Sequence, residues 1–189
     1  MPEKNTKTNT HSKIYDKLKE FLKHFIVPVF IGYLIAWILT NVLFINAIIP
    51  SGSMESTIMT GDYLLGIRHI YDFTDVERGD VVIFKYPDDE SQRFIKRVIG
   101  LPGEEVLISR GNIYINGKIL DEPYLNETWV KGNDEYLFTV PEDCYLVLGD
   151  NRNNSLDARY WTNTYVRKDQ IIGKAGIIYY PFSDFGFVE

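Results

Sequence analysis

The chain has 189 residues, 45% of them apolar and 14% aromatic, which allows one ordinary domain plus an appendage and excludes a disordered chain. Its net charge is −6, but residues 1–24 carry six lysines against three acidic residues, which leaves about −9 for the rest and argues against a nucleic-acid partner. The single cysteine excludes an intrachain disulfide, and three scattered histidines do not suggest a metal site.

An uncharged apolar run covers residues 25–49. At 1.5 Å per residue it can cross the ~30 Å hydrocarbon core of a bilayer, and membrane helices tolerate its Pro28 and Gly32. A buried soluble helix of this length would be unusual in so small a protein. A cleaved signal peptide is disfavoured, because the run is longer than such apolar stretches and residues 40–49 offer no small-x-small site. We expect an uncleaved anchor over 25–49 after a cytoplasmic basic tail over 1–24.

Residues 50–189 should form the outward-facing domain, and they carry strand signals almost throughout. Apolar runs rich in β-branched and aromatic residues lie at 80–86, 94–100, 106–109, 112–115, 118–120, 136–140, 145–148 and 171–180. Asn116-Gly117 is a strong two-residue hairpin signal, whereas residues 151–165 are polar and irregular. The pattern predicts an all-β domain, built of antiparallel sheets or a partly open barrel, with one long loop.

Two serines follow the apolar run, in Ser51-Gly52-Ser53. A serine nucleophile needs a base, and a lysine can serve when an apolar pocket keeps it neutral. Lys96 lies in the apolar strand 94–99, where alternation places it on the opposite face from Arg97, so one cation is buried whichever face is inside. Only the lysine can lose its proton. Alternatively, Lys96 reaches solvent from an edge strand and the serines form an ordinary turn.

A third polar stretch, residues 149–159, reads Gly-Asp-Asn-Arg-Asn-Asn-Ser-Leu-Asp-Ala-Arg. Its density of charged and amide groups requires mutual pairing if the stretch is ordered. Asp157 and Arg159 can form a charge-assisted pair, and Ser155 can hydrogen-bond to a lysine amine. Taken alone, the stretch is better explained as a solvated polar loop.

Together these stretches resemble the sequence boxes of type I signal peptidases. The matching segments are Pro-Ser-Gly-Ser-Met at 50–54, Arg-Gly-Asp-Val-Val at 78–82, Phe-Ile-Lys-Arg-Val-Ile-Gly-Leu-Pro-Gly at 94–103, and 149–159. Their order and the preceding single span also match, and the resemblance covers residues 25–180. The short chain with one span is more similar to the Gram-positive bacterial form than to the larger two-span form.

The resemblance implies a membrane-bound serine endopeptidase that removes signal peptides after a small-x-small sequence, with no metal or cofactor. Ser53 would be the nucleophile and Lys96 the general base. The Ser51 hydroxyl and the Ser53 backbone N–H would form the oxyanion hole. Ser155 would orient the lysine amine, with further support from Asp150, Arg152, Asp157 and Arg159.

The family also implies an extended substrate that adds a strand beside the one preceding the nucleophile. Candidate residues for its shallow apolar pockets are Ala47, Ile49, Met54, Ile58, Phe94 and Ile95. The implied partners are secretory preproteins at the translocon exit and membrane lipid, with the chain in the bacterial cytoplasmic membrane.

Two positions depart from the family pattern: Ser56 replaces a usual proline, and Ala158 replaces a usual serine. Neither change touches the dyad, although both leave substrate preference open. Two other functions remain to be weighed. One is a self-cleaving repressor peptidase, which has the dyad but no anchor. The other is a specialised or non-catalytic membrane-anchored domain that binds exported peptides.

Overall fold

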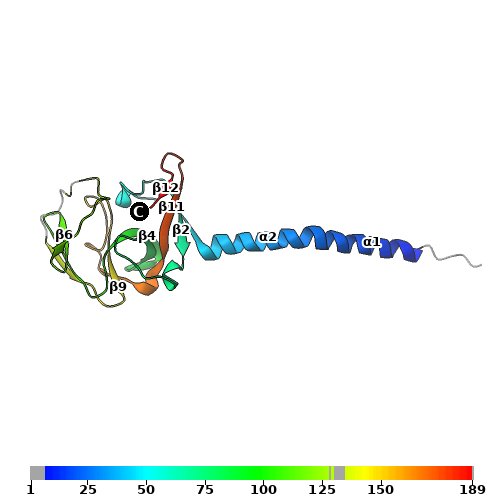
Figure 1. Cartoon of the computed structure of the whole chain (residues 1–189), viewed down its shortest axis with the longest axis horizontal. Helices are drawn as coiled ribbons and strands as arrows, with labels where there is room; N and C mark the ends of the chain where they lie inside the picture. Colours follow the sequence, from blue (N-terminus) through cyan, green and yellow to red (C-terminus); the bar gives the residue numbers. More distant parts are fainter. Residues whose placement is uncertain (1–6, 128, 130–134, 189) are drawn as a thin grey trace, which may run out of the picture. The chain divides into compact units, whose positions relative to one another are not determined.

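The protein is described here by a computed structural model covering residues 7–127, 129 and 135–188. The described part separates into a helical unit that ends at Val42 and a β-rich unit that begins at Leu43. Figure 1 shows the helical unit in blue and the strands of the second unit in cyan to red.

The helical unit runs without a break through α1 (Lys7–Phe21), a π-helical turn (η1, Leu22–Ile26) and α2 (Val27–Ile38), and a second π-helical turn (η2, Leu39–Leu43) follows. Its stretch Ile14–Leu43 contains an 18-residue window with a mean hydropathy of 2.1 and is long and apolar enough to cross a membrane. The side chains of Thr40 and Asn41 donate hydrogen bonds to backbone carbonyls of Ala36 and Trp37, so these polar groups are satisfied within the helix.

The helix ends earlier than the apolar run predicts. Residues 44–48 form a strand, β1 (Phe44–Ile48), although they continue the uncharged sequence of the span. Hydrophobic content alone does not distinguish a buried strand from the end of a helix, and here pairing with the next strand decides the outcome.

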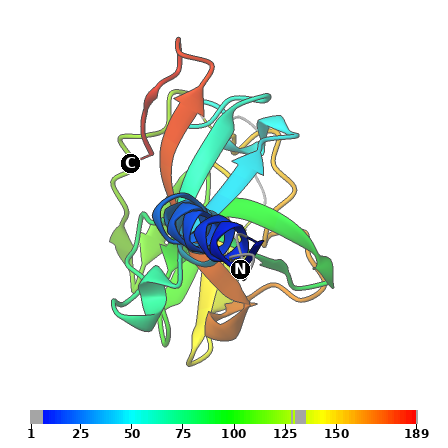
Figure 2. The same ribbon diagram turned by 90° about the vertical axis from the view of Figure 1, so that its right-hand side faces the viewer.

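The β-rich unit contains two antiparallel sheets, which confirms the predicted all-β class (Figure 1). The larger sheet has the order β1-β2-β11-β3-β4-β9-β10, with β12 paired to β11. Its remaining strands are β2 (Tyr63–Arg68), β3 (Val81–Tyr86), β4 (Asp89–Gly100), β9 (Cys144–Leu148), β10 (Val166–Arg167), β11 (Ile171–Tyr180) and β12 (Gly186–Phe187). Figure 2 shows β2 and β11 lying side by side.

The smaller sheet has the order β7-β6-β5-β8. Its strands are β5 (Glu105–Ser109), β6 (Asn112–Ile115), β7 (Lys118–Ile119) and β8 (Tyr136–Thr139). The Asn116-Gly117 hairpin forms as predicted, with positive φ at both residues (50° and 78°), as a type I′ turn requires. Residues 151–165 contain no strand or helix, in agreement with the predicted long loop.

Both faces of the larger sheet are covered around β3. Val82 and Phe84 belong to one buried cluster, while Val81 and Ile83 belong to another on the opposite side of the strand. This two-sided burial explains why β3 is a continuous apolar run. The same packing buries two neighbouring cations of β4: Lys96 is 4% exposed and Arg97 is 1% exposed. Both cations are therefore buried, whereas strand alternation required the burial of one of them.

Candidate active site

Ser53 lies in a short 3-10 turn, Gly52–Met54, that follows β1. The preceding Ser51 is extended and exposed. Met54 anchors the turn, because its side chain is only 2% exposed and packs in the core beside β1. While Met54 is buried, Ser53 beside it is only half-buried, so its hydroxyl can contact another polypeptide chain.

The predicted nucleophile and base are brought together across 43 residues of sequence. Lys96 Nζ lies 2.6 Å from Ser53 Oγ and donates a second hydrogen bond, of 3.0 Å, to the Ile95 carbonyl. Direct contact of an amine with a serine hydroxyl allows proton transfer in either direction.

Burial lowers the pKa of Lys96 to about 8, because the surrounding protein disfavours the charged ammonium. The negative charges of Asp157 and Asp150 oppose this effect and raise the pKa. With a pKa near 8, a useful fraction of the amine is neutral at physiological pH and can accept a proton from Ser53.

Asn151 holds the turn that carries Ser53. Its backbone N–H donates to the Ser53 carbonyl (3.1 Å), and its side-chain amide donates to the Gly52 carbonyl (3.0 Å). The Gly52 carbonyl belongs to the same planar peptide unit as the Ser53 N–H, on the opposite side. Fixing that carbonyl therefore fixes the direction of the Ser53 N–H, the predicted oxyanion donor. Asn151 is not among the site residues predicted from the sequence.

Gly149 allows the polar loop to approach the nucleophile closely. A Cβ at this position would lie 2.1 Å from Ser155 Oγ and 2.4 Å from the Ser53 carbonyl oxygen. Ser155 is thus next to the nucleophilic turn, but the hydrogen bond expected between its hydroxyl and the Lys96 amine is not formed. Its Oγ is buried and has no hydrogen-bond partner in the part of the chain that the structure describes.

Asp157 and Arg159 form the predicted pair, deep inside the domain. Arg159 donates to both carboxylate oxygens of Asp157, at 2.7 and 2.8 Å, and both side chains are at most 1% exposed. Asp157 also accepts the Gly149 N–H at 3.0 Å, while Arg159 donates to the Arg152 carbonyl. The pair therefore braces the backbone on both sides of the loop.

The other two support residues have partners that the sequence analysis did not identify. Asp150 receives a bidentate pair of hydrogen bonds from Arg97, at 2.9 and 2.7 Å. Arg152 forms a bidentate pair with Glu122, at 3.0 and 2.6 Å. The two partners lie 53 and 30 residues away along the chain, so neither pairing has a local sequence signal.

A groove of about 710 Å³ runs past the dyad. β1 and the start of β4 form its two sides, and five of the six predicted pocket residues line it: Ala47, Ile49, Met54, Phe94 and Ile95. Ile58 does not line the groove. Its side chain is completely buried in the core cluster with Met54 and Leu64, so its place is in packing.

Groups of three or more His, Cys, Asp or Glu side chains able to hold a metal do not occur among the described residues.

A protein-family model described as "Signal peptidase, peptidase S26" matches residues 22–180. The chain belongs to this family. The resemblance seen in the sequence is thereby confirmed, and the curated relatives agree with it. A "Probable signal peptidase I-2" from Synechocystis sp. is 42% identical over 148 residues, which cover 74% of this chain and 65% of that protein.

A signal peptidase I from Bacillus amyloliquefaciens is 33% identical over 164 residues, which cover 82% of this chain and 86% of that protein. A crystal structure of a signal peptidase I from Enterococcus faecalis is 35% identical, with a TM-score of 0.47, and the match covers 53% of this chain and 97% of that one.

The two departures from the signal peptidase pattern lie apart from the dyad's own hydrogen bonds. Ser56 is exposed, and its hydroxyl donates to the Tyr124 carbonyl at 3.4 Å. Ala158 is 1% exposed and packs in the larger core cluster, beside the buried pair of Asp157 and Arg159. A serine at this position would need a buried hydrogen-bond partner for its hydroxyl.

Proposed function

We propose that this chain is a membrane-bound endopeptidase that removes signal peptides from secreted preproteins through Ser53 and Lys96. The observation that carries the proposal is the 2.6 Å contact between Ser53 Oγ and a buried lysine amine whose pKa is about 8. Membership of the signal peptidase family supports the substrate class.

In the acylation step, Ser53 Oγ attacks the carbonyl carbon at the cleavage site while the neutral Lys96 amine takes the hydroxyl proton. The oxyanion that forms is stabilised by the Ser53 N–H and the Ser51 hydroxyl. The carbon–nitrogen bond then breaks, and the Lys96 ammonium returns the proton to the departing amine of the mature protein. The signal peptide remains esterified to Ser53.

In the deacylation step, a water molecule attacks the ester carbon and gives its proton to Lys96. Ser53 leaves as the alcohol when the ammonium returns that proton, and the signal peptide is released with a free carboxylate. The buried Ser155 hydroxyl makes no hydrogen bond to Lys96 in the structure, so an orienting role for Ser155 requires the amine to move toward it during the reaction.

The substrate lies extended in the groove between two strand edges. β1 is an edge strand with β2 as its neighbour, and β9 pairs with β4 only from Arg97 onwards, so both sides of the groove have free backbone groups. An extended peptide can pair with these groups, as in β-strand addition. The apolar lining from Ala47, Ile49 and Ile95 suits small side chains next to the scissile bond.

The proposed location is the bacterial cytoplasmic membrane, with residues 1–24 inside and the β-rich unit outside, where it meets preproteins as they leave the translocon. Excess lysine before the span supports this orientation. A cysteine introduced at the exposed Ser91 in a Cys144→Ser background tests it. Labelling of intact spheroplasts by a membrane-impermeant maleimide is expected, and labelling only after lysis would reverse the orientation.

Cleavage of a detergent-solubilised preprotein tests the activity. Wild type should release a mature protein whose N-terminus, read by mass spectrometry, follows a small-x-small sequence, whereas Ser53→Ala and Lys96→Ala should be inactive. The half-exposed Lys85 supplies a matched control, because Lys85→Ala removes a lysine outside the groove and should cleave like wild type. A wild-type protein that binds several preproteins but cuts none would instead favour the specialised or peptide-binding relative.

A further inference from the structure

The apolar helix is longer than a bilayer requires. Ile14–Leu43 spans 30 residues, or about 45 Å at 1.5 Å per residue, against a hydrocarbon thickness of roughly 30 Å. About ten residues must therefore lie outside the hydrocarbon. They belong to the N-terminal end, because residues 25–43 carry no charge while five charged residues lie between 16 and 23.

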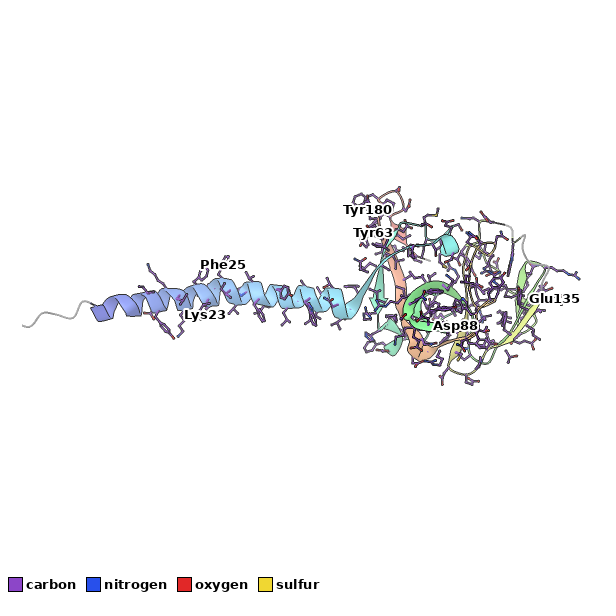
Figure 3. All side chains as sticks on the ribbon, turned by 180° about the vertical axis from the view of Figure 1, so that it is seen from behind. Lys23, Phe25, Tyr63, Asp88, Glu135 and Tyr180 are labelled. Atoms are coloured by element: carbon purple, nitrogen blue, oxygen red, sulfur yellow. The ribbon has the colours of Figure 1, made fainter. Side chains whose placement is uncertain are left out.

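The N-terminal part of this helix, residues 14–25, is amphipathic. At 100° per residue, its apolar side chains fall within an arc of about 120°: Ile14, Tyr15, Leu18, Phe21, Leu22 and Phe25. All six are more than 45% exposed in the structure, and the rings of Phe21 and Phe25 stack at 5.4 Å on this face. Figure 3 shows Lys23 and Phe25 on opposite sides of the helix.

The charges around this apolar face are also ordered. By the same periodicity, Lys17 borders the face on one side and Lys19 on the other, while Lys23 lies opposite. Glu20 and His24 pair with each other at 2.9 Å, away from the apolar face. Lysines on both borders are typical of a helix that lies in a membrane interface, because their stems cover apolar surface while their ammonium groups reach the headgroups.

The helix changes its hydrogen-bonding register where the amphipathic part meets the uncharged part. The π-helical turn Leu22–Ile26 lies there, and Pro28 follows it at the start of α2. Helices bend at π-helical turns and at prolines, since both interrupt the regular backbone ladder. The amphipathic part can therefore leave the direction of the spanning part and lie along a surface.

We propose that residues 14–25 dock on the membrane surface at the N-terminal side of the span, with the apolar face among the acyl chains and the lysines on anionic lipid headgroups. Six lysines against three acidic residues in residues 1–24 complement such a surface. A second copy of the helix is a poorer occupant. The apolar spacing lasts less than two heptads, and Tyr15 and Leu22 widen the face beyond a coiled-coil seam.

Site-specific probes on the full-length protein in lipid nanodiscs test the docking. Two variants in a Cys144→Ser background are matched: Leu18→Cys on the apolar face and Glu20→Cys on the charged face, each carrying an environment-sensitive fluorophore. In discs with phosphatidylglycerol, we expect brominated acyl chains to quench the Leu18 probe several-fold more than the Glu20 probe. Neutral phosphatidylcholine discs, or Lys17→Gln with Lys19→Gln, should reduce that difference.

Three outcomes would overturn the proposal. Weak quenching at both positions would mean that the segment projects into water. Equal, strong quenching would place it inside the hydrocarbon. Disulfide-linked dimers of the unlabelled Leu18→Cys variant, together with a Leu18 probe that lipid does not quench, would mean that a second copy covers the face. None of these readouts depends on peptide cleavage, so failure of the proposed peptidase activity leaves the test intact.

Discussion

The side-chain amide of Asn151 donates a 3.0 Å hydrogen bond to the Gly52 carbonyl, which shares a peptide plane with the N–H of Ser53. Asn151→Ala removes that constraint on the oxyanion donor, and Asn151→Asp replaces an attractive contact by a repulsive one. We expect kcat to fall about tenfold in the first variant and further in the second, since loss of an oxyanion donor itself costs roughly 10²–10³ in kcat. KM should change little.

Steady-state rates of preprotein cleavage at saturating and at limiting substrate concentration separate the effect on kcat from the effect on KM. Asn112, exposed on β6, supplies the control, because Asn112→Ala removes an amide whose hydrogen bond, within the described part of the chain, goes to the nearby Arg110 carbonyl. Wild-type kcat in Asn151→Ala would mean that the turn keeps its geometry without the amide. A rise in KM alone would assign Asn151 to substrate binding.

Gly149 leaves no room for a side chain, since a Cβ would approach Ser155 Oγ to 2.1 Å and the Ser53 carbonyl oxygen to 2.4 Å. Gly149→Ala must displace the loop or the nucleophilic turn, so we expect at least a tenfold loss of kcat/KM with Ser53 and Lys96 still present. Gly186→Ala is the matched control, because a Cβ added at Gly186 would lie 3.9 Å from its nearest atom, the Asp184 carbonyl oxygen. Equal activity in both variants would contradict the described packing.

The fold was largely predictable from the sequence, whereas the pairing around the site was not. Runs of β-branched and aromatic residues marked most strands, including β3 and β11, because each is set by its own composition. Composition did not mark β1, since its apolar residues continue the span and only pairing with β2 makes it a strand, although the family resemblance implied a strand before the nucleophile. The partners of Asp150 and Arg152 were missed as well, because tertiary contacts over 53 and 30 residues leave no local pattern.

Cleavage should depend on the protonation of Lys96. Burial lowers the pKa of this lysine to about 8. The neutral amine is the base, so kcat/KM should rise with pH and level off above that value. A profile measured from pH 6 to 10 with a preprotein whose own charges do not titrate in this range checks it. A profile that is flat between pH 6.5 and 9 would mean that Lys96 is not the group whose ionisation limits the reaction.

The same lysine should reduce the stability of the fold. Its pKa is lower in the folded protein than the ordinary value of 10.5, so the unfolded chain binds more protons between about pH 8 and 10.5, and the free energy of unfolding rises with pH there. Below pH 8 the folded protein bears the full free-energy cost of keeping the charged Lys96 buried, which is on the order of 3 kcal/mol. We expect Lys96→Met to be inactive yet more stable than wild type at pH 7, with the gain fading as the pH approaches 10.5.

Urea unfolding of Ser53→Ala and of Ser53→Ala/Lys96→Met at pH 7 and pH 10 measures this difference without proteolysis of the sample. A double variant that is less stable than Ser53→Ala at pH 7 would mean that the packing and hydrogen bonds of Lys96 outweigh the cost of burying its charge.

The pair formed by Arg97 and Asp150 should contribute far more to folding than a pair at the surface. Its side chains are at most 2% exposed, so Asp150→Ala leaves a buried guanidinium without its carboxylate and should lower the free energy of unfolding by roughly 3–5 kcal/mol. The pair of Arg167 and Asp169 is more than half exposed, and Asp169→Ala should cost less than about 1 kcal/mol.

Replacing both members of the buried pair by apolar residues distinguishes charge pairing from packing. Arg97→Met with Asp150→Leu removes both charges while keeping apolar volume, so it should recover much of the stability lost in Asp150→Ala. Urea unfolding in the Ser53→Ala background measures all three variants. If the double variant is no more stable than Asp150→Ala, the other contacts of these side chains, such as the Arg97 hydrogen bond to the Gly79 carbonyl, matter more than the loss of the carboxylate.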